Sequence, residues 1–429
     1  MFILSYIGVS GLKRTALGSI LILCAGLGLP SCGYKSNNSN NGPTTSGVTP
    51  RAFISNSTGT TAGLIIIDAT LDRVARKHAV FSAGTQPSLM FRSIDKKVTL
   101  VTSPLNLQVQ IISNAREAAS ASFPIADQTE SIVISADNGR AYVAEPNASI
   151  FGQAPGIVQV FDIKTTPVQI ATIPIPRVHT LIESPNGNRI LAFSDNSDAV
   201  TMISTSNVGT NTNPLTPIAD PLGLLSRPVA GFMNADNTTA WVISCGAECG
   251  GTNASVSKID LGTAMVLPQN VSVVAATTGV ISGNTMYVAG TSPTLPCTLS
   301  HCGQLSTVDL TSLTVTKTVE ITDGFHDRVG VGSNNRVFAG AIGCTNTPPS
   351  APPPQRGCLA IYNTQSDAVI IAPENGDVTG ILPIVGRNVV YVIVGNQFKI
   401  YDTTTDTILV QTNPLDIVGL AIDVMSPDQ

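Results

Sequence analysis

One short pattern recurs through most of the chain and limits what it can fold into. An apolar stretch such as NGRAYVAEPN at 138–147 is followed after a gap by a second apolar stretch such as GIVQVFD at 156–162. Eight copies of this pair are present between residue 51 and the C-terminus. A period of roughly 40 to 50 residues leaves room for four short strands, which is the mark of a propeller blade. The repeat therefore predicts an all-β fold, a β-propeller with eight four-stranded blades over residues 51–429. Seven blades are the alternative if one degenerate copy is an insertion.

The two ends of the repeat region each carry part of one copy. The C-terminal stretch GLAIDVMSPDQ reaches a turn and stops, whereas RAFISNST at 51–58 begins where such a turn would end. We therefore expect the last strand to be the innermost strand of the blade that the first three strands begin. This 3+1 closure leaves no open sheet edge between the first and last blades. The predicted closing strand consists of Gly419, Leu420, Ala421, Ile422, Asp423, Val424 and Met425.

Short aromatic motifs within the repeats resemble those of a known family. They are Tyr142-Val143, Tyr287-Val288, Tyr391-Val392, the run ending at Asp162, and Tyr401-Asp402. In these motifs the chain resembles the YVTN-type, YncE-like propeller repeats of bacterial envelope proteins, over nearly all of residues 51–429. The resemblance implies the fold and leaves the function open, because such propellers host many activities. Eight copies depart from the seven expected of that family.

The N-terminus has the features of an export signal. Lys13-Arg14 precedes the apolar run TALGSILILCAGLGL, which ends at Pro30-Ser31-Cys32. A basic segment, a short apolar run and a small-residue cleavage site are typical of a secretory signal. Leu29-Pro30-Ser31-Cys32 resembles the lipobox of bacterial lipoproteins, which predicts a signal peptide over 1–31 and a lipid on Cys32. An ordinary secretory signal is the alternative. Cys24 is a poorer candidate because bulky Leu23 precedes it.

Residues 32–50 are polar and rich in Asn, Ser and Gly, so we expect a flexible tether. Gly33, rather than an Asp, follows the cysteine. By resemblance to Gram-negative lipoproteins, this residue implies the outer membrane. The expected protein is thus exported and lipid-anchored to the cell envelope, with a membrane contact through Cys32 and a monomeric propeller beyond the tether.

The six remaining cysteines occur in close pairs between the second and third strands of three successive blades. An oxidising compartment favours disulfides, and pairing within each loop is the simplest connectivity. A zinc site is the alternative, with His301 beside Cys302, but the spacings do not match the usual zinc pattern. Covalent haem is disfavoured because no C-x-x-C-H occurs. The expected disulfide residues are Cys245, Cys249, Cys297, Cys302, Cys344 and Cys358.

An acidic or amide residue ends the third strand in most copies, and turn residues follow it. Asp and Asn side chains bond the backbone two residues on and so favour turns. We therefore expect a structural role, not a catalytic one, for Asp68, Asp162, Asp260, Asp309, Asn363 and Asp402.

Composition excludes several classes of function. Charged residues are 12% of the chain and the net charge is -5, with no basic stripe that would indicate nucleic acid. Trp241 is the single tryptophan, which argues against sugar stacking and against the tryptophan-rich quinoprotein propellers. No cofactor and no metal site are predicted.

Two functions remain open. The disulfide loops are long and rigid, so the favoured function is a binding or scaffold module for a protein, a peptide or an envelope polymer. The alternative is a lactone or ester hydrolase at the mouth of the central channel, with a general base and an anion clamp. Its candidate residues are Glu130, His179 and one of His326, Asp327 and Arg328, with Arg227 close by.

Overall fold

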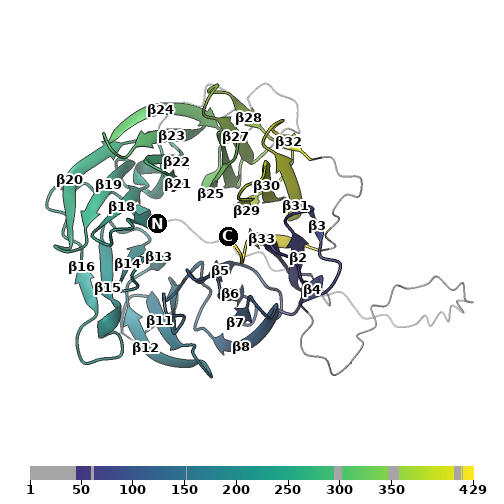
Figure 1. The fold of residues 1–429 in the computed structure, drawn as a ribbon. Coiled ribbons are helices and arrows are strands. Elements are labelled where there is room, and N and C mark those ends of the chain that lie inside the picture. The colour runs from purple at the N-terminus through teal and green to yellow at the C-terminus, as the bar shows by residue number, and fades with distance from the viewer. Residues whose placement is uncertain are drawn as a thin grey trace, which may run out of the picture. The chain divides into compact units, whose positions relative to one another are not determined.

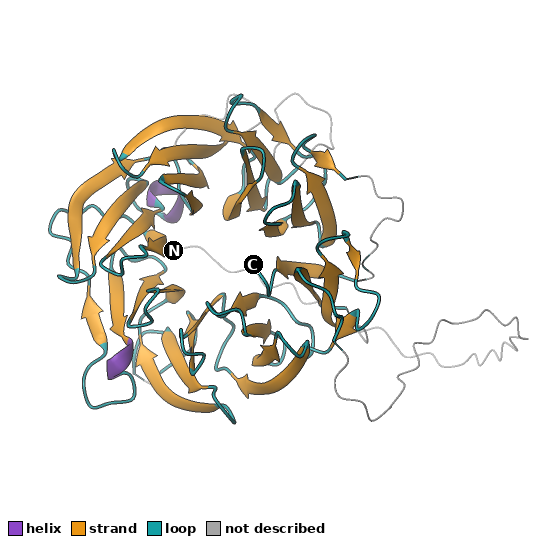
Figure 2. Cartoon of the chain, viewed as in Figure 1, coloured by secondary structure: helices purple, strands orange, loops and turns teal. Residues whose placement is uncertain are grey.

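The computed structural model describes residues 45–58, 62–150, 152–293, 302–345, 357–409, 417 and 419–429. The predicted signal peptide, Cys32 and most of the predicted tether lie outside these residues. Pro43–Gln429 form one compact unit, in which eight antiparallel sheets stand in a ring (Figure 1). The described residues contain no α-helix; η2 (Thr205–Asn207) and η3 (Gly246–Cys249) are single 3-10 turns (Figure 2). The prediction of an eight-bladed β-propeller is confirmed.

Blades are numbered 1 to 8 in chain order, and each has four strand positions from the axis outward. The innermost strands are β33 (Ala421–Met425), β5 (Met90–Arg92), β9 (Ser131–Ile134), β13 (Val178–Glu183), β17 (Pro228–Met233), β21 (Thr278–Ser282), β25 (Phe325–Gly332) and β29 (Val378–Pro383). The second strands are β1 (Arg51–Asn56), β6 (Val98–Ser103), β10 (Arg140–Glu145), β14 (Arg189–Ser194), β18 (Thr239–Ser244), β22 (Thr285–Thr291), β26 (Arg336–Ile342) and β30 (Val389–Val394).

The outer half of each blade follows the same order. The third strands are β2 (Gly63–Asp68), β7 (Gln108–Ser113), β11 (Ile157–Asp162), β15 (Val200–Ser204), β19 (Ser255–Asp260), β23 (Gly303–Asp309), β27 (Leu359–Asn363) and β31 (Gln397–Asp402). The outermost strands are β3 (Arg73–Val74) with β4 (Val80–Phe81), β8 (Ala118–Pro124), β12 (Val168–Pro174), β16 (Leu215–Pro217), β20 (Met265–Ser272), β24 (Thr314–Ile321), β28 (Val369–Ile371) and β32 (Thr407–Ile408). Blade 1 divides its outermost position between β3 and β4, which both pair with β2.

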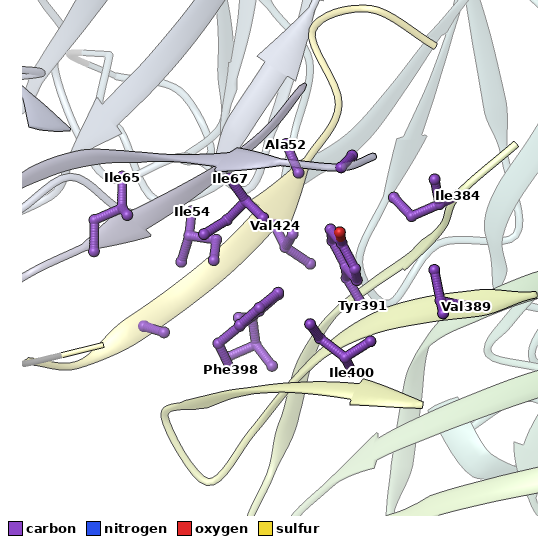
Figure 3. Packing of buried hydrophobic residues seen from close by; sticks show 13 residues of the cluster. Ala52, Ile54, Ile65, Ile67, Ile384, Val389, Tyr391, Phe398, Ile400 and Val424 are labelled. Carbon is purple, nitrogen blue, oxygen red and sulfur yellow. The ribbon is translucent and has the colours of Figure 1, made fainter. Parts of the chain in front are cut away.

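The core is divided among the interfaces between neighbouring blades. A buried apolar cluster lies at each of the eight interfaces, because the second and third strands are apolar on both faces. At the interface of blades 8 and 1, Ile54 and Val424 face Tyr391 and Ile400 (Figure 3). This repeated two-sided burial accounts for a chain rich in apolar residues and poor in charge.

The ring closes through β33, which pairs antiparallel with β1 and matches Phe53 with Met425 and Ile54 with Val424. The 3+1 closure is therefore confirmed, but the closing strand begins at Ala421 rather than at Gly419. Gly419 has a φ of 131°, and a Cβ there would lie 2.1 Å from the side-chain oxygen of Asn56. This residue therefore turns the chain toward β1 and cannot continue a strand.

A buried ionic cluster lies beside the same junction, at the first residue of β1. Nη1 of Arg51 lies 2.7 Å from Oε1 of Glu117 in blade 2, and Nη2 lies 2.6 Å from Oδ1 of Asp428. The Ser46 hydroxyl donates to Glu117 at 2.5 Å, and Ser46 is only 8% exposed. The last part of the predicted tether, residues 45–50, thus packs against the ring, because the Glu117 carboxylate binds it there.

The acidic and amide residues that end the third strands have the predicted structural role in turns. Each accepts a hydrogen bond from the backbone N–H two residues on, at 2.7 to 3.0 Å. The residues are Asp68, Asp162, Asp260, Asp309, Asn363 and Asp402.

Deleting residues 419–429 should open the ring. Without β33, the apolar face of β1 and one side of blade 8 lose their cover, so we expect aggregation and rapid proteolysis. Limited trypsin digestion with size-exclusion chromatography measures both. The control is Leu420→Ala, because Leu420 directly precedes β33 and is 48% exposed. A monomeric, protease-resistant deletion product would contradict the closure.

Arg51→Ala should lower the free energy of unfolding by about 3–5 kcal/mol, because it leaves the Glu117 carboxylate buried without its cation. The side chains of Arg51 and Glu117 are 11% and 1% exposed. Urea unfolding measures the loss. The matched control is Arg116→Ala, because Arg116 is an exposed arginine that directly precedes Glu117 in the chain. An equal effect of the two substitutions would show that the cluster does not stabilise the fold.

Candidate functional site

One face of the ring carries the connections from second to third strands and from each blade to the next. We call it the disulfide face, because Cys245–Cys249 and Cys344–Cys358 form disulfides there, in blades 5 and 7. These two pairs confirm the predicted pairing within loops. Cys302 of blade 6 is also disulfide-bonded. Cys297 and His301 lie outside the described residues.

Three hollows surround the loop that the Cys245–Cys249 disulfide braces. The axial hollow, of about 410 Å³, is lined by Asp195, Asn196, Arg227, Glu248 and Phe325, among others. The outer hollow, of about 730 Å³, is lined by Asp198, Asp220, Arg227 and Thr252. The side hollow, of about 180 Å³, is lined by Cys245, Glu248, Thr252 and Val274. Each pair of hollows shares one wall residue, Arg227, Glu248 or Thr252, so the three hollows adjoin one another around the loop, and we call them together the groove.

Glu130 and His179 are neighbours on the axial side of this face, as the repeat alignment predicts. Nε2 of His179 lies 2.9 Å from Oε2 of Glu130. This hydrogen bond raises the pKa of His179 above its usual value and lowers the pKa of Glu130. The negative charge of Asp195, in the axial hollow, further raises the pKa of His179. The pair therefore lies next to the groove.

β-bulges near the start of β13 and β25 each leave one residue of the innermost strand without a partner. In β13 the register shifts between Val178 and Thr180, which makes His179 the extra residue. In β25 the same shift makes Asp327 the extra residue, between His326 and Arg328. Asp327, and not His326, is therefore the counterpart of His179.

His326 does not belong to a site at the axis. Its imidazole is fully buried between blades 6 and 7, where Cε1 would lie 2.8 Å from a Cβ on Gly303. Neither ring nitrogen makes a hydrogen bond of ordinary geometry to a described residue, and burial lowers the pKa of His326 to about 4. The predicted role of His326 at the channel mouth does not fit this position, because one residue of register turns its side chain into the interface.

Arg328 lies on the axial side but is held by its own surroundings. Its Nε donates to the carbonyl of Thr379 at 2.9 Å, and Nη1 lies 3.3 Å from Oδ2 of Asp327. Its charge also lowers the pKa of Glu130. Among the candidate catalytic residues, Glu130 and His179 thus form a hydrogen-bonded pair. Arg328 acts on that pair through its charge, and His326 is buried away from it.

Arg227 is the cation of the groove. Its φ of 55° places it in the left-handed region, and its backbone N–H donates to Oδ1 of Asp198 at 2.9 Å. Its Nη1 lies 3.6 Å from the same oxygen. Asp198 therefore holds an arginine with an unusual backbone conformation between the axial and outer hollows.

Glu248 and Phe325 are groove residues that the sequence did not single out. Glu248 lies in η3, and its Oε2 accepts the N–H of Thr291 in blade 6 at 2.7 Å. Burial raises the pKa of Glu248 to about 7. Phe325 begins β25 and is 44% exposed beside the axial hollow. An acidic residue inside the CGAEC loop was the available signal for Glu248; none marked Phe325.

The buried His326 should make stability fall in acid. Its ordinary pKa of 6.5 applies to the unfolded chain, whereas the folded value is about 4. The unfolded state therefore binds a proton first as the pH falls, which costs about 3 kcal/mol of stability between pH 6.5 and 4. His326→Leu should remove that part of the slope in urea unfolding curves recorded across this range. Parallel pH profiles for the variant and the wild type would contradict the assignment.

Comparison with known proteins supports the fold alone. No protein-family model and no curated protein matches the chain. A structure of Kuenenia stuttgartiensis hydrazine synthase aligns with a TM-score of 0.52 and 14% identity, over 75% of this chain and 96% of that one. The dihydro-heme d1 dehydrogenase NirN in complex with DHE aligns with a TM-score of 0.51 and 14% identity, over 77% of this chain and 66% of that one. Both similarities support a β-propeller.

Proposed function

We propose that this protein is an exported binding module that holds its ligand on the disulfide face. The observation that carries the proposal is the groove of three hollows around one disulfide-braced loop, the Cys245–Cys249 loop. Ligand sites are concave and largely pre-formed, and they combine apolar walls with a few polar groups. The groove has this composition, with Phe325 and Val274 beside Arg227, Asp195 and Glu248.

The walls of the groove are built to be rigid. The disulfide closes the short loop between Cys245 and Cys249, and Glu248 bonds that loop to β22 of the next blade. The backbone N–H of Gly251 also donates to the carbonyl of Gly246 at 2.8 Å. A pre-formed site loses less entropy on binding, which favours recognition over induced closure.

Export and lipid anchoring are part of the proposal. Two disulfides fit an oxidising compartment outside the cytoplasm. The signal-like N-terminus supports a lipid on Cys32 and anchoring to the cell envelope at the outer membrane. The aromatic motifs of the repeats support kinship with the YVTN-type, YncE-like propellers. In the part of the chain that the structure describes, no helix is long and apolar enough to cross a membrane.

Hydrolysis is the second candidate, favoured by the contact between Glu130 and His179 beside the axial hollow. The raised pKa of His179 keeps the imidazole in its protonated form to a higher pH, which weakens it as a general base. The burial of His326 removes one of the predicted catalytic residues. Binding therefore ranks ahead of catalysis.

In-cell photo-crosslinking tests the binding role. A photoreactive amino acid at Ala247, which lines the side hollow, should capture a ligand in cells that express the full chain. The photoreactive amino acid placed instead at Ile94, which is 55% exposed on the opposite face, should capture no ligand. Identical adducts from both positions, or none from Ala247, would overturn the proposed site.

The anchor is tested by growth with a radiolabelled fatty acid. The wild-type chain should carry the label and sediment with the membrane fraction, and Cys32→Ser should do neither. Cys24→Ser is the matched control and should leave both unchanged. Label that persists in Cys32→Ser would place the lipid elsewhere.

Turnover of a panel of lactones and esters tests the second candidate. We expect no hydrolysis above background from the purified protein, because the described residues bring no complete catalytic set together at the axis. Turnover that His179→Ala abolishes and His78→Ala preserves would instead make the protein an enzyme with its site beside the axial hollow.

A further inference from the structure

The groove on the disulfide face has a chemistry that selects among ligands. We propose that it binds an extended polypeptide segment that carries both cationic and apolar side chains. This inference rests on the proposed binding function and names the class of partner for the same site.

Exposed apolar side chains line two of the hollows, and a third belongs to the residue next to the wall of the outer hollow in the sequence. Phe325 lines the axial hollow and is 44% exposed, and Val274 lines the side hollow and is 40% exposed. Leu222, 58% exposed, adjoins Gly223 in the wall of the outer hollow. Exposed apolar residues scattered singly need no explanation, but three gathered around adjoining hollows indicate an interaction surface.

The charge around the groove is mostly negative. Asp195 is exposed in the axial hollow, and no described hydrogen bond engages its carboxylate. The Asp198 carboxylate is 61% exposed, although it also holds Arg227. Among the described residues that line the three hollows, Arg227 is the only cation, and Asp198 partly neutralises it. The groove therefore favours a cationic partner.

Negative charge also predominates over the disulfide face as a whole. Among the described residues, its connections and strand starts carry three arginines, Arg177, Arg227 and Arg328. The carboxylates there are more numerous: Asp127, Glu130, Asp195, Asp198, Asp220, Glu248, Asp323, Asp327, Glu374 and Asp377. Most described cations lie on the opposite face, in its connections or at the first residues of the second strands, among them Arg51, Lys96, Lys97, Arg116, Arg140, Lys164, Arg189, Arg336 and Arg387. A field of one sign over one face steers partners of opposite charge toward it.

A polypeptide fits these features better than a polysaccharide. Successive side chains of an extended peptide can reach different hollows, and hydrogen-bonding side chains such as Asn196, Asn253 and Thr252 line the walls for its backbone. Phe325 is the only aromatic residue among the described residues of the hollow walls, and one ring alone is a poor platform for stacking sugar rings. The partner we infer is a basic, apolar segment of another protein.

Binding of the purified full-length protein to a random-peptide array tests this. Bound peptides should be enriched in Lys or Arg together with an apolar residue, and the signal should weaken as the ionic strength rises. Phe325→Ala, and separately the pair Asp195→Asn with Glu248→Gln, should reduce the signal by roughly tenfold. Leu105→Ala, 69% exposed on the same face in blade 2, and Asp236→Asn, on the opposite face, are the matched controls and should change little.

Enrichment of acidic peptides, no sequence preference, or equal binding by the groove variants and the controls would overturn the inference. Binding to a glycan array without binding to peptides would also overturn it and would identify a polysaccharide ligand. If Ala247 captures a ligand in cells while no peptide binds, the proposed function stands and this inference fails. Absence of any capture at Ala247 would instead remove the proposed function.

Discussion

The pairing of β33 with β1 is the contact on which the other interfaces depend. A blade is stable only when both of its faces are covered, and in an open row of eight the first and last blades would each expose one. The closing strand joins blade 1 to blade 8 by covalent continuity of the chain and buries Val424 against Tyr391. Asp423 in the same strand accepts the backbone N–H of Met90 in blade 2 at 3.0 Å. Three blades thus share one five-residue strand, and the groove on the far side of the ring depends on their alignment.

The architecture followed from the sequence because it repeats. The strand pairs and the turn role of residues such as Asp260 recur in copy after copy. A chance pattern in one copy therefore does not change the predicted fold or the number of blades. The errors arose where a single residue of register matters. Gly419 reads as part of an apolar strand, but its positive φ turns the chain instead. The sequence also left the counterpart of His179 open among three successive residues, and a bulge places Asp327, not His326, in that position. A bulge depends on tertiary pairing and leaves no periodic signal.

The candidate site was less predictable for a different reason. The paired cysteines marked the loops, but the groove arises only where the connections of blades 4 and 5 meet Val274 and Phe325 of other blades. Glu248 acquires its raised pKa from burial against β22, about forty residues along the chain, and Phe325 is exposed although its neighbour His326 is fully buried. Such properties belong to contacts between loops, and sequence patterning within one loop does not encode them.

The attachment of residues 45–50 gives the fold a mechanical character. The chain enters the ring at Arg51, on the face opposite the groove, and runs through β1 toward the disulfide face. A ligand held in the groove and a pull on the N-terminal segment would load β1 along its length. In that geometry the hydrogen bonds of β1 to β2 and to β33 bear the force together, in shear, rather than opening one at a time. The Arg51 contacts with Glu117 and Asp428 lie at the end that is loaded first. The strand β1, with which the closing strand β33 pairs, would thus transmit the load from one face of the ring to the other.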